Sequence, residues 1–346
     1  MKSLMKPRTL HKGDTIITIS PCNGWAGDTD VRWKYELGVK RLQEIGLNVI
    51  AAPNSLKGTD YLSRNPQARA EDFMWAFTRQ NANAVIANMG GNDSIQVIPY
   101  IDPKCIEENN KIFVGYSDVM NLHVLCYKHG LSTFYGDNLL NPIAEAQGWH
   151  DYSKKWFIDV LFSHKVIGTI PPAKEWTYEP INYTDPQYIR KYYKNSSPSY
   201  DLIQGNGIVQ GRLFGGHTGL MELSGTILDL SQKDFENKIL FLEGIPRFYT
   251  KDALSKFFDW LGQINALQKI NGVILGKANQ KSLFQEEKKE IVRIISDKYG
   301  LSNLPVLYGL NFGHSSPICM LPYGTMAEIN CDEKTFSVLE SGTIEY

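Results

Sequence analysis

Three short motifs, far apart in the sequence, carry residue types that could together perform acyl-transfer chemistry. Ser117 lies in GYSD, Glu243 in FLEG and His314 in GHSSP. A serine hydroxyl becomes a nucleophile when a histidine takes its proton, and a carboxylate can orient that histidine. Each motif also has a simpler interpretation, since the serine can cap a helix and the other two can be ordinary strand-end and turn residues. The hypothesis therefore depends on whether the fold brings the three together.

The stretch around Ser117 predicts a strand, a sharp turn and a helix. Ile112–Val114 is a short apolar run typical of a buried strand, and apolar residues recur at helical spacing from Val119 onward. This places Ser117 at the turn, beside the free N–H groups of a helix N-terminus. The layout is that of a nucleophile elbow, in which the next backbone N–H can face an oxyanion. The second glycine of G-x-S-x-G is missing, so helix capping by Ser117 or Asp118 stays the simpler alternative.

Composition and charge exclude several classes of protein. The 346 residues are 42% hydrophobic and 21% charged, with a formal net charge of -1, so nucleic acid and anionic membranes are poor partners. No apolar run is long enough to span a bilayer, and the basic N-terminal stretch lacks the apolar core of a secretory signal. Five scattered cysteines without a C-x-x-C pattern indicate reduced thiols in a cytoplasmic protein. No clustered His and Cys pattern indicates a metal site, and no cofactor is expected.

The first half of the chain alternates between strand-like and helix-like segments, which predicts a parallel sheet covered on both faces. Right-handed crossovers bring every strand-to-helix turn to one edge, where open α/β sheets bind ligands. The Gly90-Gly91 turn and the turn at Ser117 should both lie there. Two glycines let a backbone N–H approach a ligand, although a Gly-Gly pair is more often only a tight turn.

The second half resumes after a long connection rich in Pro, Tyr, Asn and Ser. We expect an N-terminal domain over residues 1–168, a connection over 169–205 and a C-terminal domain over 206–346. Connections of this length tend to be functional or flexible. Trp176 could stack on a ligand ring there, or it could only pin the connection to the protein body. After Ile318, alternating polar and apolar residues predict short antiparallel strands.

Over nearly its whole length the sequence resembles the LD-carboxypeptidases of the serine peptidase type. The matching pieces, in order, are TIITISP, the Gly-Gly turn, GYSD, TFYG, GRLFGGHTGLMELSGT, ILFLEG and GHSSPICMLPYG. The resemblance implies an α/β fold with an N-terminal Rossmann-like or flavodoxin-like parallel sheet and a smaller, β-rich C-terminal domain. It also implies a homodimer and a hydrolase that cleaves an amide near a carboxyl end.

Matching the motifs assigns a role to five residues. By this resemblance Ser117 is the nucleophile, His314 the general base and Glu243 the residue that orients the base. The backbone N–H groups of Gly91 and Asp118 would form the oxyanion hole.

Within the family, the GGNDS turn and the EWTYEP segment resemble the branch that contains the microcin C immunity carboxypeptidase. This implies a peptidyl- or aminoacyl-nucleotide substrate, contacted by Gly90, Asn92, Trp176 and His217. Two departures bear on the substrate. His217 stands where the family commonly has Asn, and Gly244 replaces an acidic residue.

Three alternative functions stay open at this point. One is cleavage of a murein tetrapeptide in cell-wall recycling, and another is a catalytically silent homologue that only binds a ligand. A nucleotide-using Rossmann enzyme is disfavoured, because SPCNG stands after the first strand in place of G-x-G-x-x-G.

Overall fold

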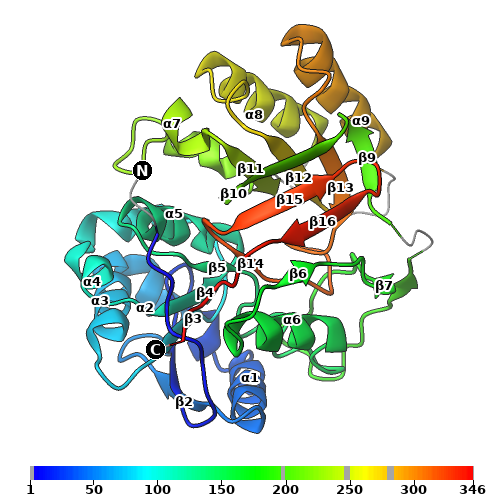
Figure 1. Ribbon diagram of the computed structural model, residues 1–346. Coiled ribbons are helices and arrows are strands. Elements are labelled where there is room, and N and C mark those ends of the chain that lie inside the picture. Colours follow the sequence, from blue (N-terminus) through cyan, green and yellow to red (C-terminus); the bar gives the residue numbers. More distant parts are fainter. Residues whose placement is uncertain (1–3, 196–198, 245–249, 279–283, 346) are drawn as a thin grey trace.

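The fold has two lobes, each built on its own β-sheet (Figure 1). The computed structural model describes residues 4–195, 199–244, 250–278 and 284–345. Its described strands form a six-stranded sheet, an eight-stranded sheet and a two-stranded hairpin. Both large sheets carry helices, which confirms the expected α/β class with an N-terminal parallel sheet and a β-rich second half.

The N-terminal sheet has the strand order β14-β5-β4-β3-β1-β2. Its strands are β1 (Thr15–Ile19), β2 (Asn48–Ala51), β3 (Ala84–Ala87), β4 (Ile112–Gly115), β5 (Phe134–Tyr135) and β14 (Leu321–Pro322). β1 to β5 pair in parallel, and β14 joins the edge antiparallel to β5. Every residue of β3 and β4 is buried, as expected of central strands that are covered on both faces.

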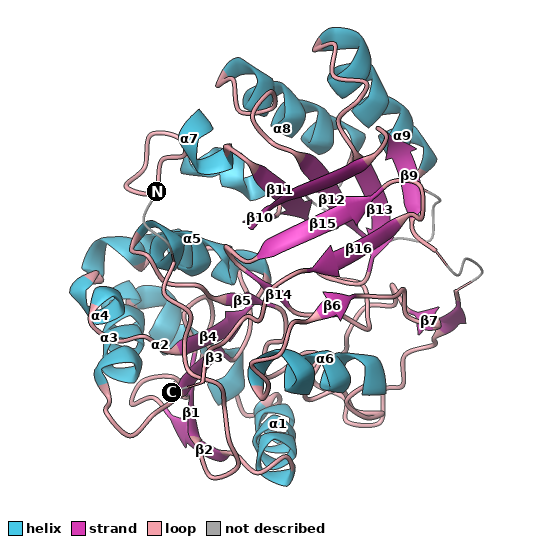
Figure 2. Ribbon diagram, in the orientation of Figure 1, coloured by secondary structure: helices cyan, strands magenta, loops and turns pink. Residues whose placement is uncertain are grey.

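Helices and short helical turns connect and cover these strands. They are η1 (Trp25–Gly27), α1 (Arg32–Glu44), α2 (Thr59–Arg64), α3 (Pro66–Thr78), η2 (Ser94–Gln96), η3 (Ile98–Tyr100), α4 (Lys104–Glu107), η4 (Ser117–Val119), α5 (Met120–Lys128) and α6 (Asp151–Leu161). Figure 2 shows α3 and α4 on one side of the lobe and α1 and α6 on the other. The predicted strand-helix alternation of this half is therefore confirmed.

The C-terminal sheet has the order β6-β16-β15-β10-β11-β12-β13-β9. Its strands are β6 (Gly168–Thr169), β9 (Asp201–Gln204), β10 (Ile208–Gly216), β11 (Lys238–Leu242), β12 (Gly272–Gly276), β13 (Val306–Leu310), β15 (Met326–Asn330) and β16 (Thr335–Val338). Its helical segments are η5 (Thr218–Leu223), α7 (Gln232–Phe235), α8 (Lys251–Gln263), α9 (Gln285–Val292) and the π-helical η6 (Arg293–Lys298). β10 to β13 are parallel, and the strands flanking them are antiparallel.

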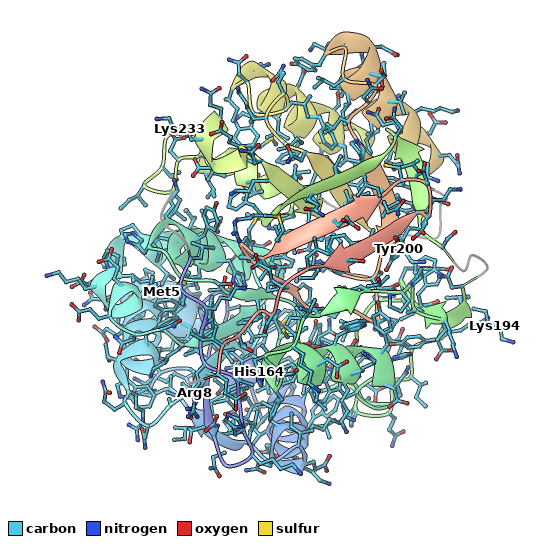
Figure 3. The ribbon with its side chains drawn as sticks, viewed as in Figure 1. Met5, Arg8, His164, Lys194, Tyr200 and Lys233 are labelled. Carbon is cyan, nitrogen blue, oxygen red and sulfur yellow. The ribbon has the colours of Figure 1, made fainter. Side chains whose placement is uncertain are left out.

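The connection over 169–205 is more regular than its composition suggested. It contains the hairpin β7 (Glu175–Trp176) and β8 (Tyr193–Lys194), and β9 adds to the edge of the C-terminal sheet. Tyr200 is 3% exposed and its hydroxyl donates to the carbonyl of Ile170 at 2.7 Å. Figure 3 shows Tyr200 against the C-terminal sheet and Lys194 at the outer edge of the molecule. A buried tyrosine thus anchors the end of this segment.

The two lobes exchange short strands, so the domain bounds stay a prediction. β6, which spans the predicted bound at 168, pairs with β16 of the C-terminal sheet, and β14, from the last part of the chain, pairs with β5 of the N-terminal sheet. The backbone N–H of Thr9 also donates to the carbonyl of Ile344 at 2.9 Å. Segments far apart in sequence are therefore side by side, and this holds the two sheets in one body (Figure 1).

The remaining expectations from composition concern cysteines, membranes and metals. All five cysteines are free and buried, as predicted. The described residues contain no helix long and apolar enough to cross a bilayer, and no group of three or more His, Cys, Asp and Glu side chains arranged to hold a metal.

Candidate active site

Four strand ends from both lobes converge on one site. Ser117 follows β4, and Gly90 follows the neighbouring strand β3 of the N-terminal sheet. Glu243 comes directly after β11, and His314 comes four residues after the end of β13. Parallel strands end at the same edge of a sheet, which is where α/β folds place their ligands. Because the two sheets turn these edges toward one another, residues nearly two hundred positions apart become neighbours.

The turn at Ser117 is strained in the way that a nucleophile elbow requires. Ser117 has φ 67°, which is the left-handed region that residues with a Cβ rarely adopt. Such conformations persist where the surroundings over-determine them, and they cluster at functional sites. A Cβ built on Gly90 would lie 2.7 Å from the Cβ of Ser117, so glycine is needed at that position. The β3 turn therefore packs directly against this serine.

The three side chains named from the sequence form one hydrogen-bonded relay. The hydroxyl oxygen of Ser117 lies 3.2 Å from Nε2 of His314, and Nδ1 of His314 lies 2.5 Å from Oε2 of Glu243. A carboxylate only accepts hydrogen bonds, so Nδ1 carries the proton and Nε2 can accept from the serine hydroxyl. The side chain of His314 is 25% exposed and that of Glu243 is fully buried. The relay thus runs from a buried carboxylate to a solvent-accessible imidazole.

A tyrosine that the sequence reasoning did not single out completes the relay. The hydroxyl of Tyr135, in β5, donates to Oε1 of Glu243, and its oxygen accepts the backbone N–H of Ser117 at 3.1 Å. Burial alone would raise the pKa of Glu243, but His314, His217 and the bond from Tyr135 outweigh it and lower that pKa below its usual value. Glu243 is therefore held ionised, and one phenol ties it to the serine turn.

Glycine is also required at the histidine turn. Gly313 has φ 90°, and a Cβ built on it would lie 2.6 Å from Oε2 of Glu243. The ring of His314 packs edge-on against Tyr116, with ring centres 5.2 Å apart. The missing side chain at position 313 thus lets the histidine turn pass close enough to the carboxylate for a direct hydrogen bond.

Two backbone N–H groups, those of Gly91 and Asp118, are predicted to form the oxyanion hole. Within the described residues, the backbone N–H groups of Gly91 and Asp118 donate no hydrogen bond. The side chain of Asp118 accepts the backbone N–H of Ser94 at 2.8 Å, while the hydroxyl of Ser94 donates to the carbonyl of Asp118 at 2.7 Å. These paired bonds fix the turn after β3 to the serine turn, and so hold both N–H groups in place.

A cavity of about 210 Å³ opens in front of the serine. Gly90, Ser117 and His314 line it, whereas Asn92 and Trp176 are not among its described lining residues. Asn92 is exposed, and the ring of Trp176 lies 4.8 Å from Nζ of Lys277. Gly90 thus lies at the cavity, and the substrate contacts of Gly90, Asn92 and Trp176 all stay predictions.

His217, a predicted substrate contact, is buried beside the relay. It is 6% exposed, and its Nδ1 accepts the backbone N–H of Gly219 at 3.0 Å. Burial is the main cause that lowers the pKa of His217 to about 4, with Glu243 opposing the change and His314 adding to it. The imidazole is therefore neutral at neutral pH.

The sequence did not mark two residues of the site, Tyr135 and Arg190, as functional. Tyr135 lies in the TFYG segment, which was noted only as part of the resemblance, and its apolar neighbours suggested a strand and nothing more. Arg190 lines the cavity but belongs to the long connection, where no periodicity marks any residue. Both depend on contacts across the fold, which a local pattern does not report.

Comparisons with known proteins agree with this architecture. Residues 16–136 match the family profile of the LD-carboxypeptidase N-terminal domain, and residues 210–329 match that of the LD-carboxypeptidase C-terminal domain. Microcin C7 self-immunity protein MccF of Escherichia coli is 29% identical over 338 residues, covering 96% of this chain and 94% of the relative. A probable murein peptide carboxypeptidase of Bacillus subtilis is 26% identical over 342 residues, covering 98% of this chain and 96% of the relative.

Solved structures of similar proteins share the fold over almost the whole chain. A MccF-like protein from Streptococcus pneumoniae in complex with AMP has a TM-score of 0.85 at 29% identity, covering 94% of this chain and 98% of its own. MccF in complex with aspartyl sulfamoyl adenosine has a TM-score of 0.84 at 25% identity, covering 98% of this chain and 100% of its own. The chain with GYSD, FLEG and GHSSP therefore belongs to the LD-carboxypeptidase family of serine-type carboxypeptidases.

Proposed function

We propose that this carboxypeptidase hydrolyses its substrate through Ser117, His314 and Glu243. The observation that carries the proposal is the continuous relay of 3.2 Å from serine to imidazole and 2.5 Å from imidazole to carboxylate. Serine, base and orienting acid within hydrogen-bond reach are the geometric signature of an activated nucleophile. The left-handed backbone at Ser117 and the ionised state of Glu243 support the same roles.

The proposed reaction has two steps with a covalent intermediate. Nε2 of His314 takes the hydroxyl proton as Oγ of Ser117 attacks the carbonyl carbon of an amide-type bond. The proton then passes to the leaving nitrogen as the bond to it breaks, which leaves an acyl-serine. In the second step His314 takes a proton from water, whose oxygen attacks the acyl carbon, and the proton returns to Oγ.

The oxyanion of both tetrahedral intermediates would be held by the backbone N–H groups of Gly91 and Asp118. Donors of this kind are already oriented before the reaction, so they stabilise the charge without reorganisation, and losing one typically costs about 100-fold or more in rate. The absence of any described protein acceptor at these two N–H groups supports the assignment.

For the substrate we propose a peptidyl- or aminoacyl-nucleotide of the microcin C kind. The support is the similarity to MccF and to structures that hold AMP or aspartyl sulfamoyl adenosine. A murein tetrapeptide is the second candidate, supported by the similarity to the probable murein peptide carboxypeptidase. Incubating the enzyme with an aspartyl phosphoramidate of AMP and with a murein tetrapeptide, followed by mass spectrometry, separates the two. Cleavage of the tetrapeptide alone would overturn the nucleotide assignment.

The nucleophile is tested by Ser117→Ala together with a serine-reactive phosphonate. The variant should fold normally and lose turnover. The phosphonate should label the parent enzyme at Ser117 and should leave the variant unlabelled. Turnover by the variant at the parental rate would refute the assignment. A parent enzyme that folds but neither turns over nor reacts would instead support a catalytically silent binding protein.

The proposed assembly rests on the family resemblance, and the proposed location rests on the scattered, unpaired cysteines and the N-terminal sequence. We expect a homodimer in the cytoplasm. Light scattering coupled to size-exclusion chromatography tests the dimer, and fractionation of cells tests the location.

A further inference from the structure

One wall of the cavity in front of Ser117 is built from buried charge. Arg190 lines this cavity together with Ser117 and His314, and it is 4% exposed. Among the described residues that line the cavity, Arg190 carries the single permanent positive charge. A negatively charged group that enters the cavity would therefore meet a guanidinium close to the nucleophile.

The hydrogen bonds of this guanidinium are incomplete. Nη1 of Arg190 donates to the carbonyl of Glu179 at 3.1 Å, and Nη2 lies 2.9 Å from Oε1 of Glu145. Within the described part of the chain, neither Nη2 nor Nε makes a well-aligned hydrogen bond. A guanidinium has five N–H donors in a fixed fork, and buried donors without a partner cost free energy. Nη2 is thus held by the ion pair with Glu145, and Nε is a buried donor without a hydrogen-bond partner among the described residues, on a side chain that lines the cavity.

The charge around Glu145 is unbalanced as well. Lys34 is 1% exposed and its ammonium donates to the carbonyl of Ala144 at 2.8 Å. Burial lowers the pKa of Lys34 to about 8, and repulsion from Arg190 and Arg41 adds to this against the attraction of Glu145. Lys34 and Arg190 are therefore two buried cations near Glu145, and Arg190 alone is ion-paired with it. Glu179 also lines the cavity, and its Oε1 accepts the hydroxyl of Tyr193 at 2.6 Å. A second anion beside Arg190 would relieve this excess of positive charge.

We propose that Arg190 is a specificity-determining residue, which binds an oxyanion of the substrate (a carboxylate or a phosphate) in the cavity in front of Ser117. The proposal rests on the function proposed above, because the same cavity holds the nucleophile. The planar fork of arginine matches the two oxygens of either group. A carboxypeptidase must also recognise a chain end, and a cation near the nucleophile provides that recognition.

The test compares ligands that differ only in the negative charge. Calorimetry measures binding of AMP against adenosine, and of N-acetyl-D-alanine against its amide, to the parent enzyme and to Arg190→Gln. The parent should prefer the anion in at least one pair by roughly 30-fold or more, as for other buried charge pairs. Arg190→Gln should remove that preference and leave the affinity for the neutral ligand unchanged. The pair that responds identifies the phosphate or the carboxylate as the source of the oxyanion.

A matched control separates this role from loss of charge in general. Arg41 belongs to the same charged group, with Nη1 donating to the carbonyl of Glu145 at 2.6 Å, but it is not among the described residues that line the cavity. Arg41→Gln removes an equal charge and should keep most of the preference. If Arg190→Gln unfolds, Arg190→Lys keeps the charge without the fork and should show a smaller but measurable loss.

Each result decides the proposal. A parent enzyme without preference in either pair, or an Arg190 variant that keeps it, overturns the role of Arg190. Labelling of Ser117 by the phosphonate in the Arg190 variant shows that the nucleophile is intact, so failure of this inference is distinguishable from failure of the proposed function.

Discussion

Replacing Tyr135 with phenylalanine removes one oxygen atom that joins two parts of the relay. In the parent enzyme this oxygen donates a hydrogen bond to Oε1 of Glu243 and accepts the backbone N–H of Ser117. Tyr135 and Glu243 are both 0% exposed, so water does not readily replace the lost bonds. The substitution keeps the ring and its packing against Phe241, where the ring centres are 5.3 Å apart. The effect should therefore come from the hydroxyl.

The magnitude follows from the two lost bonds. A hydrogen bond to a charged group contributes about 1.5–3 kcal/mol and one between neutral groups about 1 kcal/mol, so the free energy of unfolding should fall by about 2.5–4 kcal/mol. The bond to Ser117 holds the strained turn. If that contribution of about 1 kcal/mol is lost from the geometry of attack, kcat/KM falls about fivefold. The pKa of Glu243 should rise in the variant, because the bond from Tyr135 helps to lower it.

Tyr323→Phe is the matched control. Tyr323 is also 0% exposed, and its hydroxyl donates to the carbonyl of Gly215 at 2.6 Å, so the variant loses a buried hydrogen bond that is not part of the relay. Urea unfolding should show a loss of stability in both variants, and steady-state kinetics should show a loss of kcat/KM in Tyr135→Phe alone. Equal kcat/KM for parent and Tyr135→Phe, at a pH where both are folded, would refute the linking role.

Three further predictions test the relay and its surroundings. Glu243→Gln should lower kcat by about three to four orders of magnitude with the fold intact, because an amide favours the wrong imidazole tautomer. Steady-state kinetics at a single pH measures this loss. A loss below tenfold would contradict the role of Glu243 in orienting His314. Gly313→Ala should lower the free energy of unfolding by more than the roughly 1–2 kcal/mol of a strained backbone, since the new methyl meets Glu243. Gly130→Ala is the control, because Gly130 has φ 84° with open space around it, and this variant should keep full activity. The unfolding free energy should fall as the pH is lowered from 6.5 to about 4, because the unfolded state protonates His217 while the native state, with a pKa of about 4, does not. Urea titrations at several pH values should show a smaller dependence of the unfolding free energy on pH in His217→Asn. An unchanged dependence would show that other groups cause it.

The sequence alone was sufficient for the α/β class and for the strand that carries Ser117. Apolar runs at β3 and β4 and helical spacing after Val119 are local signals, and the structure confirms the elements they predict. The family resemblance added the three motif residues, whose types and order are also visible in the chain. What it left open was whether they meet, because the distance between side chains on different strands is not a local property.

Tertiary structure alone decided the parts of the site that depend on contacts between lobes. Tyr135 occupies an unremarkable two-residue strand, and its function in the site comes from lying between Glu243 and the backbone of Ser117. Arg190 lies in a segment without periodicity, and only burial beside Glu145 makes its charge significant. The sequence determines which groups are present and which strands carry them. How the two sheets pack, with the carboxyl ends of their parallel strands facing each other, determines which groups share a hydrogen bond or a low-dielectric cavity. Both effects require atoms within a few ångströms of each other.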